Sequence, residues 1–193
     1  MYKMLRLAAI AAAAAVAVQL TGCANMAMTA PQPTMANATK LRAANMAPAA
    51  VGTFKIDPAK ASADKEMFMR GSNGVHAPNG SFAQYLGDSL KVELQSAGLL
   101  DPASGTVITG TLTQTELDAA IGTGKAKLGA RFVVTRSNAV TYDRELTVDA
   151  EWESSFMGAV AIPLAAQNYE GLYRKLVSKL FDDAAFRTAV AKP

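Results

Sequence analysis

The sequence has few of the side chains from which enzymes build metal centres and nucleophilic sites. Its 193 residues include one cysteine, Cys23, and one histidine, His76. A single cysteine excludes an intrachain disulfide and a cysteine-based zinc site. His76 has no second histidine with which to share a metal ion, and we expect it in an exposed loop. We therefore expect no catalytic residues, no metal site and no cofactor, and a protein that is not an enzyme.

The chain also has little excess of positive over negative charge. The formal net charge is +3, from 19 basic and 16 acidic residues. Lys3 and Arg6 lie in a segment that we expect to be removed, which leaves 17 basic and 16 acidic residues and a net charge of +1. Domains that bind nucleic acid carry a basic patch on one face. We therefore expect no nucleic-acid partner.

The first 22 residues have the layout of a secretory signal peptide. A short basic region that contains Lys3 and Arg6 precedes an apolar run of 14 residues, Leu7 to Leu20. Small residues follow the run, as in cleaved signals. A membrane-spanning helix needs roughly 20 apolar residues. A cleaved signal over residues 1–22 is therefore favoured over an uncleaved membrane anchor.

The end of this leader, Leu20, Thr21, Gly22 and Cys23, resembles the lipobox of bacterial lipoproteins. The resemblance implies a diacylglycerol on the Cys23 sulfur, cleavage before Cys23 and acylation of the new amino terminus. Two or three acyl chains anchor a protein stably where one does not. Ala24 stands where an aspartate is the signal for inner-membrane retention, so we expect the outer membrane, facing the periplasm. Inner-membrane anchoring is the alternative.

Residues 23–50 are expected to form the lipidated cysteine and a flexible tether. Small residues dominate residues 24–50, prolines interrupt them at 31, 33 and 48, and no apolar face repeats. A random coil of this length spans about 30 Å. A short helix near residues 40–46 is left open. The tether would hold the remaining chain away from the membrane.

Residues 51–193 are expected to form a single α+β domain. We predict strands at 51–56, 106–117, 125–136 and 140–152, and a loop over 59–80. A helix begins after Ser81, which forms a capping box with Gln84, and ends at Gly98. A long closing helix has Pro163 in its first turn or at a kink. The order strand, helix, three-stranded meander and helix predicts a two-layer sandwich, with a mostly antiparallel sheet and two helices on one face.

The last two predicted strands have complementary charges. If Arg136 pairs with Val140, three opposite-charge pairs follow on the polar face: Arg131 with Glu145, Lys127 with Asp149, and Lys125 with Glu151. A slip of one residue would turn every apolar side chain away from the core. The acidic residues of this row are therefore expected to line a solvated strand face. The threonines at 109, 111, 113 and 115 are expected to form a flat polar face, a common docking surface.

From Phe82 to Val190 the chain resembles small periplasm-facing lipoproteins of the YajG-like and LptE-like kinds. The resemblance rests on the helix FAQYLGDSLKVELQSAGLL, the strands VITGTL and FVVTR, and the closing helix NYEGLYRKLVSKLFDDAAF. It implies a sheet backed by two helices and a role in envelope maintenance. We expect a membrane-anchored, non-enzymatic binding or assembly module, with an envelope protein or a lipid as partner. The alternative is an accessory subunit of an envelope transport or export complex, for lipid or lipopolysaccharide. The oligomeric state is open.

Overall fold

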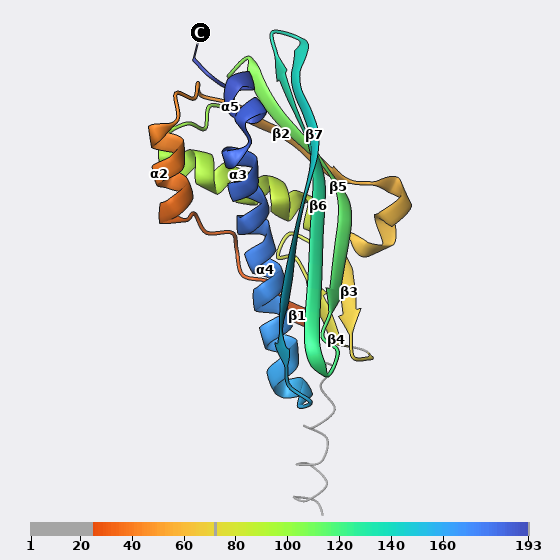
Figure 1. Cartoon of the computed structure of the whole chain (residues 1–193). Helices are drawn as coiled ribbons and strands as arrows, with labels where there is room; N and C mark the ends of the chain where they lie inside the picture. Colours follow the sequence, from red (N-terminus) through yellow and green to blue (C-terminus); the bar gives the residue numbers. More distant parts are fainter. Residues whose placement is uncertain (1–24, 72, 193) are drawn as a thin grey trace, which may run out of the picture.

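A four-stranded sheet forms the centre of the computed structural model, which describes residues 25–71 and 73–192. Its order is β2 (Ala50–Ile56), β5 (Thr106–Asp118), β6 (Gly122–Arg136) and β7 (Ala139–Ser154). β2 runs parallel to β5, and the other neighbours are antiparallel. The helices α3 (Phe82–Ala97) and α4 (Gly158–Asp182) lie on one face of this sheet (Figure 1). The predicted α+β fold is therefore confirmed.

The hairpin of β6 and β7 has the predicted register along most of its length. The three predicted charge pairs lie opposite each other: Arg131 and Glu145, Lys127 and Asp149, Lys125 and Glu151. Near the turn the register shifts, so Arg136 faces Ala139, and the predicted pairing with Val140 is wrong. Ser137 and Asn138 have φ angles of 50° and 64°. Two successive positive φ angles are typical of a two-residue hairpin turn. The turn is therefore one residue shorter than the connection over residues 137–139 that the predicted strand ends imply.

Helix α3 begins and ends as its sequence predicts. The Ser81 hydroxyl accepts a hydrogen bond from the Gln84 N–H at 3.1 Å. At the other end Gly98 has a φ of 74°, which a residue without Cβ adopts at no steric cost. The Leu99 N–H then donates to the Leu94 carbonyl at 2.8 Å. These local bonds satisfy backbone groups that a helix end leaves unpaired.

Residues 59–80, predicted to be a loop, include part of a second sheet. Its order is β1 (Met26–Ala27), β4 (Asn73–His76) and β3 (Glu66–Met69), and the 3₁₀ helix η2 (Pro58–Ala63) precedes it. Met67 and Met69 are buried, whereas Phe68 between them is exposed. The Thr115 hydroxyl lies 3.4 Å from the Met67 sulfur, which places β3 against β5. The prediction of a loop is therefore wrong. The alternation of Met67, Phe68 and Met69 is too short to have indicated a strand from the sequence.

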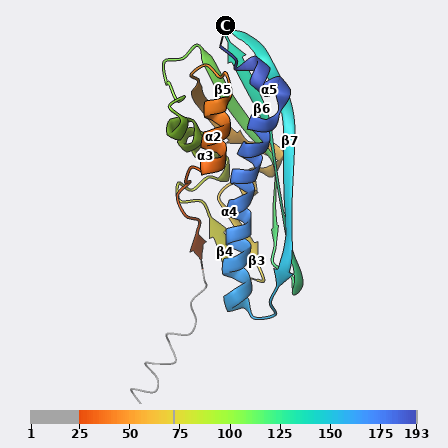
Figure 2. The same cartoon turned by 60° about the vertical axis from the view of Figure 1, so that its left-hand side comes forward.

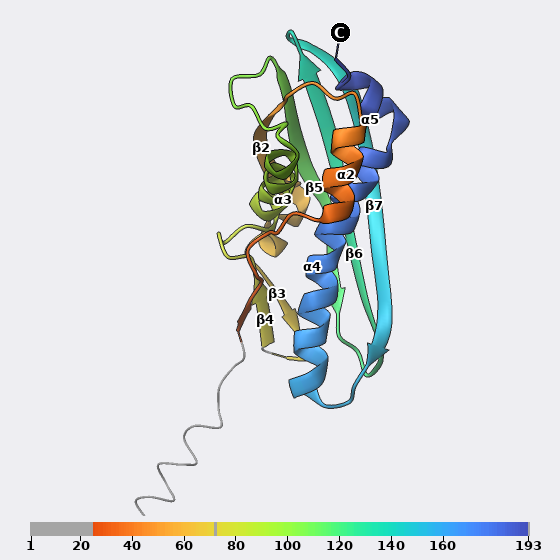
Figure 3. The same ribbon diagram turned by 90° about the vertical axis from the view of Figure 1, so that its left-hand side faces the viewer.

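The flexible tether predicted for residues 24–50 is wrong for the part that the structure describes. Residues 26–27 form β1, and α2 (Met35–Ala43) packs beside α3 and α4 (Figure 3). Leu41 is only 2% exposed. The buried Glu93 carboxylate on α3 accepts hydrogen bonds from the Thr34 N–H at 3.1 Å and from the Asn37 amide at 2.8 Å. The packed unit therefore includes residues 25–50, and α2 overlaps only in part with the short helix that the sequence left open near residues 40–46.

Helix α4 is the longest helix of the described chain and crosses the sheet from end to end (Figure 2). It begins at Gly158, so Pro163 lies inside the helix and not in its first turn. Tyr169 and Tyr173 are fully buried and meet edge to face with ring centroids 5.2 Å apart. After α4, Asp183 caps α5 (Ala184–Ala189) by accepting hydrogen bonds from two backbone N–H groups. The aromatic face of α4 thus forms much of the core.

The outer face of the four-stranded sheet differs from the prediction at one threonine. The register of β5 and β6 shifts between Leu112 and Gln114. Thr115 consequently points inward and is buried, so the prediction that it shares the polar face is wrong. The Thr113 hydroxyl remains outside and donates to Glu145 at 2.6 Å. One bulge residue is enough to reverse the side-chain alternation beyond it.

Candidate functional site

The described residues offer little acid–base or metal chemistry. Within residues 25–71 and 73–192, no group of three or more His, Cys, Asp and Glu side chains is arranged to hold a metal ion. His76 is the last residue of β4 and is half-buried, so the prediction that it lies in an exposed loop is wrong. Its carbonyl accepts the Met28 N–H at 2.9 Å. His76 thus contributes a backbone group to the small sheet.

Three buried hydroxyl groups form a chain between β5 and α4. The Tyr169 hydroxyl is hydrogen-bonded to Thr115 and, at 2.8 Å, to Tyr173. Burial raises the pKa of both tyrosines above the ordinary range because the phenolate would lose its hydration. Both side chains keep their protons at neutral pH. The chain of hydroxyl groups therefore joins α4 to the sheet.

The acidic row of β7 does not form a site either. Arg131 donates from Nε to Asp143 at 2.6 Å, across a diagonal of the sheet, instead of to the opposite Glu145. Lys125 lies 3.6 Å from Glu151, and both side chains are well exposed. Two acidic residues of this row, Asp143 and Glu151, are thus each paired with a cation, and Glu145 accepts the hydrogen bond from Thr113. This arrangement matches the expected solvated strand face.

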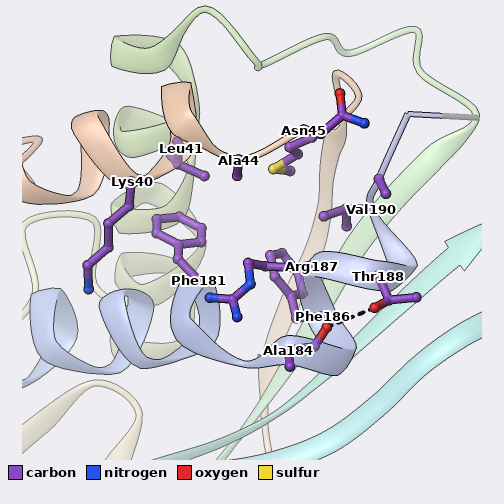
Figure 4. A pocket seen from close by; sticks show the side chains of 12 residues that line it. Lys40, Leu41, Ala44, Asn45, Phe181, Ala184, Phe186, Arg187, Thr188 and Val190 are labelled. Carbon is purple, nitrogen blue, oxygen red and sulfur yellow. Dashed lines mark hydrogen bonds between the residues drawn. The ribbon is translucent and has the colours of Figure 1, made fainter.

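An apolar pocket of about 440 Å³ opens where α2 meets the end of α4 and α5 (Figure 4). Its apolar lining comes from two segments that are distant in sequence: Leu41, Ala44, Met46, Phe181, Ala184, Phe186, Val190 and Ala191. The size falls within the range of about 300 to 1,000 Å³ that is usual for small-molecule pockets. Its lining is mainly hydrophobic, so the pocket suits an apolar group.

Two cationic side chains stand at this pocket. In Figure 4 the ring of Phe181 lies between Lys40 and Arg187. The Lys40 ammonium is 2.6 Å from the Asp182 carboxylate and donates to Ser178 at 2.9 Å. Arg187 is exposed and forms no ion pair with another described residue. The guanidinium is therefore available to an anionic group at the rim.

Backbone bonds between the two ends of the described chain hold this pocket together. The Ala47 N–H donates to the Val190 carbonyl at 2.8 Å, and the Lys192 N–H donates to the Asn45 carbonyl at 2.8 Å. Sequence reasoning missed the pocket because it assigned Lys40 to Met46 to a flexible tether. The prolines and alanines that favoured a tether gave no sign of the distant C-terminal partner.

The predicted lipidation and cleavage residues, Cys23 with Leu20, Thr21 and Gly22, lie outside the described residues and remain predictions. Asn25, the first described residue, lies beside Gly74 of β4. Within the part of the chain that is described, no helix is both long and apolar enough to cross a membrane.

The fold is similar to that of several bacterial proteins of known structure. Protein XCC0632 from Xanthomonas campestris, of the family DUF330, matches with a TM-score of 0.59 and 16% identity, over 85% of this chain and 96% of its own. A putative lipoprotein from Caulobacter crescentus matches with a TM-score of 0.45 and 14% identity, over 82% of this chain and 99% of its own. A minor lipoprotein from Acinetobacter baumannii matches with a TM-score of 0.36 and 14% identity, over 74% of this chain and 91% of its own.

No protein-family model matches the chain, and no curated protein matches it by sequence. At 16% identity, the likeness to the Xanthomonas protein shows a shared fold and nothing about ligands or partners. The chain thus has an α+β fold similar to that of XCC0632.

Proposed function

We propose that this protein is a bacterial envelope lipoprotein, anchored through acyl chains on Cys23, that acts as a non-enzymatic binding module. The pocket between α2 and α5 carries the proposal, because it is the described feature that best combines an apolar lining with an available cation. Its ligand is an amphiphile: an apolar chain contacts Phe181, Phe186 and Val190, and an anionic end meets Arg187. A fatty acid or the acyl end of an envelope lipid has this chemistry.

The anchor is supported by the sequence, where the only cysteine directly follows an apolar leader. The proposed site of action is the periplasm-facing outer membrane, with the inner membrane as the alternative. Replacement of Cys23 by serine removes the sulfur that accepts the diacylglycerol. We expect the Cys23→Ser chain to take up no radiolabelled palmitate, to keep its signal peptide and to carry no acyl chains. Normal processing and membrane partitioning of this variant would contradict the anchor.

Ligand binding is tested with a fluorescent fatty acid and the detergent-free protein. Ala184 lines the pocket and is exposed, so Ala184→Trp places an indole ring in the space for an acyl chain. We expect the variant to lose most of the fluorescence signal. Ala103→Trp adds the same ring at an exposed loop position that does not line the pocket and is the matched control. Equal binding by both variants would contradict an acyl site between α2 and α5.

A role as accessory subunit of an envelope transport or export complex is a second candidate. It is favoured by the outer face of the four-stranded sheet, where Thr109, Thr111 and Thr113 are partly exposed opposite the helices. An open sheet face is a common docking surface. Light scattering of the full chain in detergent tests this role. A closed ring of copies would favour the transport subunit, and a monomer would favour the simple binding module.

A further inference from the structure

Exposed apolar side chains gather at the end of the molecule opposite the pocket. Phe156 is 75% exposed and Ile121 is 72% exposed, and they are accompanied by Met157 and Val160. Ile121 belongs to the β5–β6 turn, whereas the other three belong to the β7–α4 loop and the first turn of α4. Gly122 pairs with Ser154, which brings these two connections together. We refer to Ile121, Phe156, Met157 and Val160 as the apolar tip.

The apolar tip is flanked by segments without charge. No Asp, Glu, Lys or Arg occurs from 154 to 169 or from 119 to 124. An α-helix rises 1.5 Å per residue, so Glu170 lies about 18 Å along α4 from Gly158. Strand residue Glu153, opposite Thr123, is closer to the tip and faces solvent. A helix face that enters a membrane interface is buried by about 5 to 10 Å, and the two connections that carry the tip have no charged residue of their own to bring with them.

Arg70 joins the apolar tip to the small sheet. Its guanidinium donates to the carbonyls of Ala119 at 2.6 Å, Ser155 at 2.6 Å and Phe156 at 3.0 Å. These bonds satisfy backbone carbonyls of both connections, which would be costly to bury unpaired in a membrane. They also use donors of the Arg70 guanidinium, which would otherwise bring an unpaired charge to the tip. Arg70 therefore holds the two connections of the tip together and pairs three of their backbone carbonyls.

The chain enters the described structure at the same end. Asn25 lies beside Gly74 of β4, and the Asn73 amide donates to the Arg70 carbonyl at 3.1 Å. Figure 1 shows β1, β4 and the start of α4 in the same half of the molecule. Cys23 precedes Asn25 by two residues, which span at most about 7 Å in any conformation. A lipid on Cys23 would thus hold this end, and no other, against the bilayer.

We propose that the apolar tip inserts into the surface of the membrane that holds Cys23, so that the protein binds the bilayer at two places. This inference rests on the proposed lipid anchor. Two contacts fix the orientation: α4 runs away from the membrane, and the pocket between α2 and α5 opens at the far end. The occupant of the tip is the bilayer interface, because the exposed side chains are apolar and the attached segments carry no charge for a polar partner.

The test uses the full, lipidated chain in phosphatidylcholine vesicles. Once the Cys23 sulfur is acylated, Phe156→Cys and Ile121→Cys each provide a single free thiol for an environment-sensitive fluorophore. Lipids with a nitroxide near the headgroup are the quenchers. We expect at least twofold stronger quenching at both tip positions than at Val140→Cys. Val140 is a matched control, because it is apolar, 62% exposed and beside the β6–β7 turn at the opposite end.

The outcomes separate this inference from the anchor. If the protein floats with the vesicles and the two tip probes are selectively quenched, both the anchor and the insertion are supported. Flotation with equal or no quenching at the three positions overturns the insertion and leaves the anchor. A blue-shifted tip probe that nitroxide lipids do not quench indicates that the tip is covered by a second copy of this chain and also overturns the insertion. A chain that neither floats nor carries acyl groups overturns the anchor, and the insertion with it.

Discussion

The two ends of the molecule differ in how far their aromatic side chains are exposed to solvent. Phe186 of α5 is 1% exposed, whereas Phe156, just before α4, is 75% exposed. The 25 residues of α4 separate these ends by about 37 Å. At the Phe186 end, α2 lies over the aromatic side chains and leaves a pocket beneath an arginine. At the Phe156 end, no described element covers them. One end is thus built to enclose an apolar group, and the other to contact an apolar surface.

The difference depends on the segment that precedes the four-stranded sheet. Residues 25–50 run along the helical layer, from β1 near the apolar tip to α2 at the pocket. Without them the pocket would lose Lys40, Leu41 and Met46 and become an open surface. The same segment keeps the lipidation site close to the tip.

Truncation of the two phenylalanines should separate the ends most clearly. Phe186 packs edge to face on Tyr142 at 5.6 Å and against Phe181 at 6.2 Å. Phe186→Ala should lower the free energy of unfolding by about 3 to 4 kcal/mol, since it leaves a cavity in the core. Phe156→Ala should change it by less than about 0.5 kcal/mol. Urea unfolding followed by circular dichroism measures both. Similar losses at both positions would show that Phe156 is packed in solution.

Loss of the Glu93 carboxylate should release residues 34–37. Glu93→Ala removes the acceptor for the Thr34 N–H and for the Asn37 amide. Because both bonds involve a buried charged acceptor, we expect a loss of about 2 to 3 kcal/mol. Glu93→Gln keeps one carbonyl acceptor and should cost less. Hydrogen exchange should accelerate in α2 and remain unchanged in β6. If α2 keeps its protection in Glu93→Ala, the carboxylate does not hold the segment.

Charge reversal at the rim should weaken binding while the fold stays intact. Arg187→Glu replaces the available cation of the pocket, and an exposed charge pair contributes up to about 1 kcal/mol. We therefore expect decanoate to bind about fivefold more weakly or worse. Decanol, which has no charge, should bind equally to both proteins. Isothermal titration measures each affinity. An equal loss for decanol would indicate that the helix had been disturbed.

The smallest effect is expected on the outer sheet face, between the two ends. The hydrogen bond from Arg131 lowers the pKa of the Asp143 carboxyl below its ordinary value. A lowered folded-state pKa stabilises the fold above the unfolded pKa near 3.9, and the stabilisation is lost as the pH falls through the folded pKa. Arg131→Ala should raise the pKa of Asp143 in an NMR titration. Unfolding curves of the two proteins should differ slightly at pH 7 and converge at pH 2.

The sequence predicts the parts of this fold whose partners are close along the chain. The β6–β7 register follows from charges and alternation within 31 residues, and the α3 ends follow from Ser81 and Gly98. The packing of residues 25–50 depends on Glu93, Glu170 and Val190, which are about 60 to 140 residues away. No local pattern reports such partners, and the prolines and alanines of this segment favour a tether. The pocket therefore could not be predicted from the sequence.

Because orientation and site of action both depend on the lipid, the most direct measurement is the mass of the N-terminal peptide from membrane-extracted protein. We predict a mature chain that begins at Cys23, with a diacylglyceryl group on its sulfur and in most molecules a third acyl chain on its amino group. A peptide that still contains Leu20, Thr21 and Gly22, or one with an unmodified Cys23, would contradict the lipid anchor.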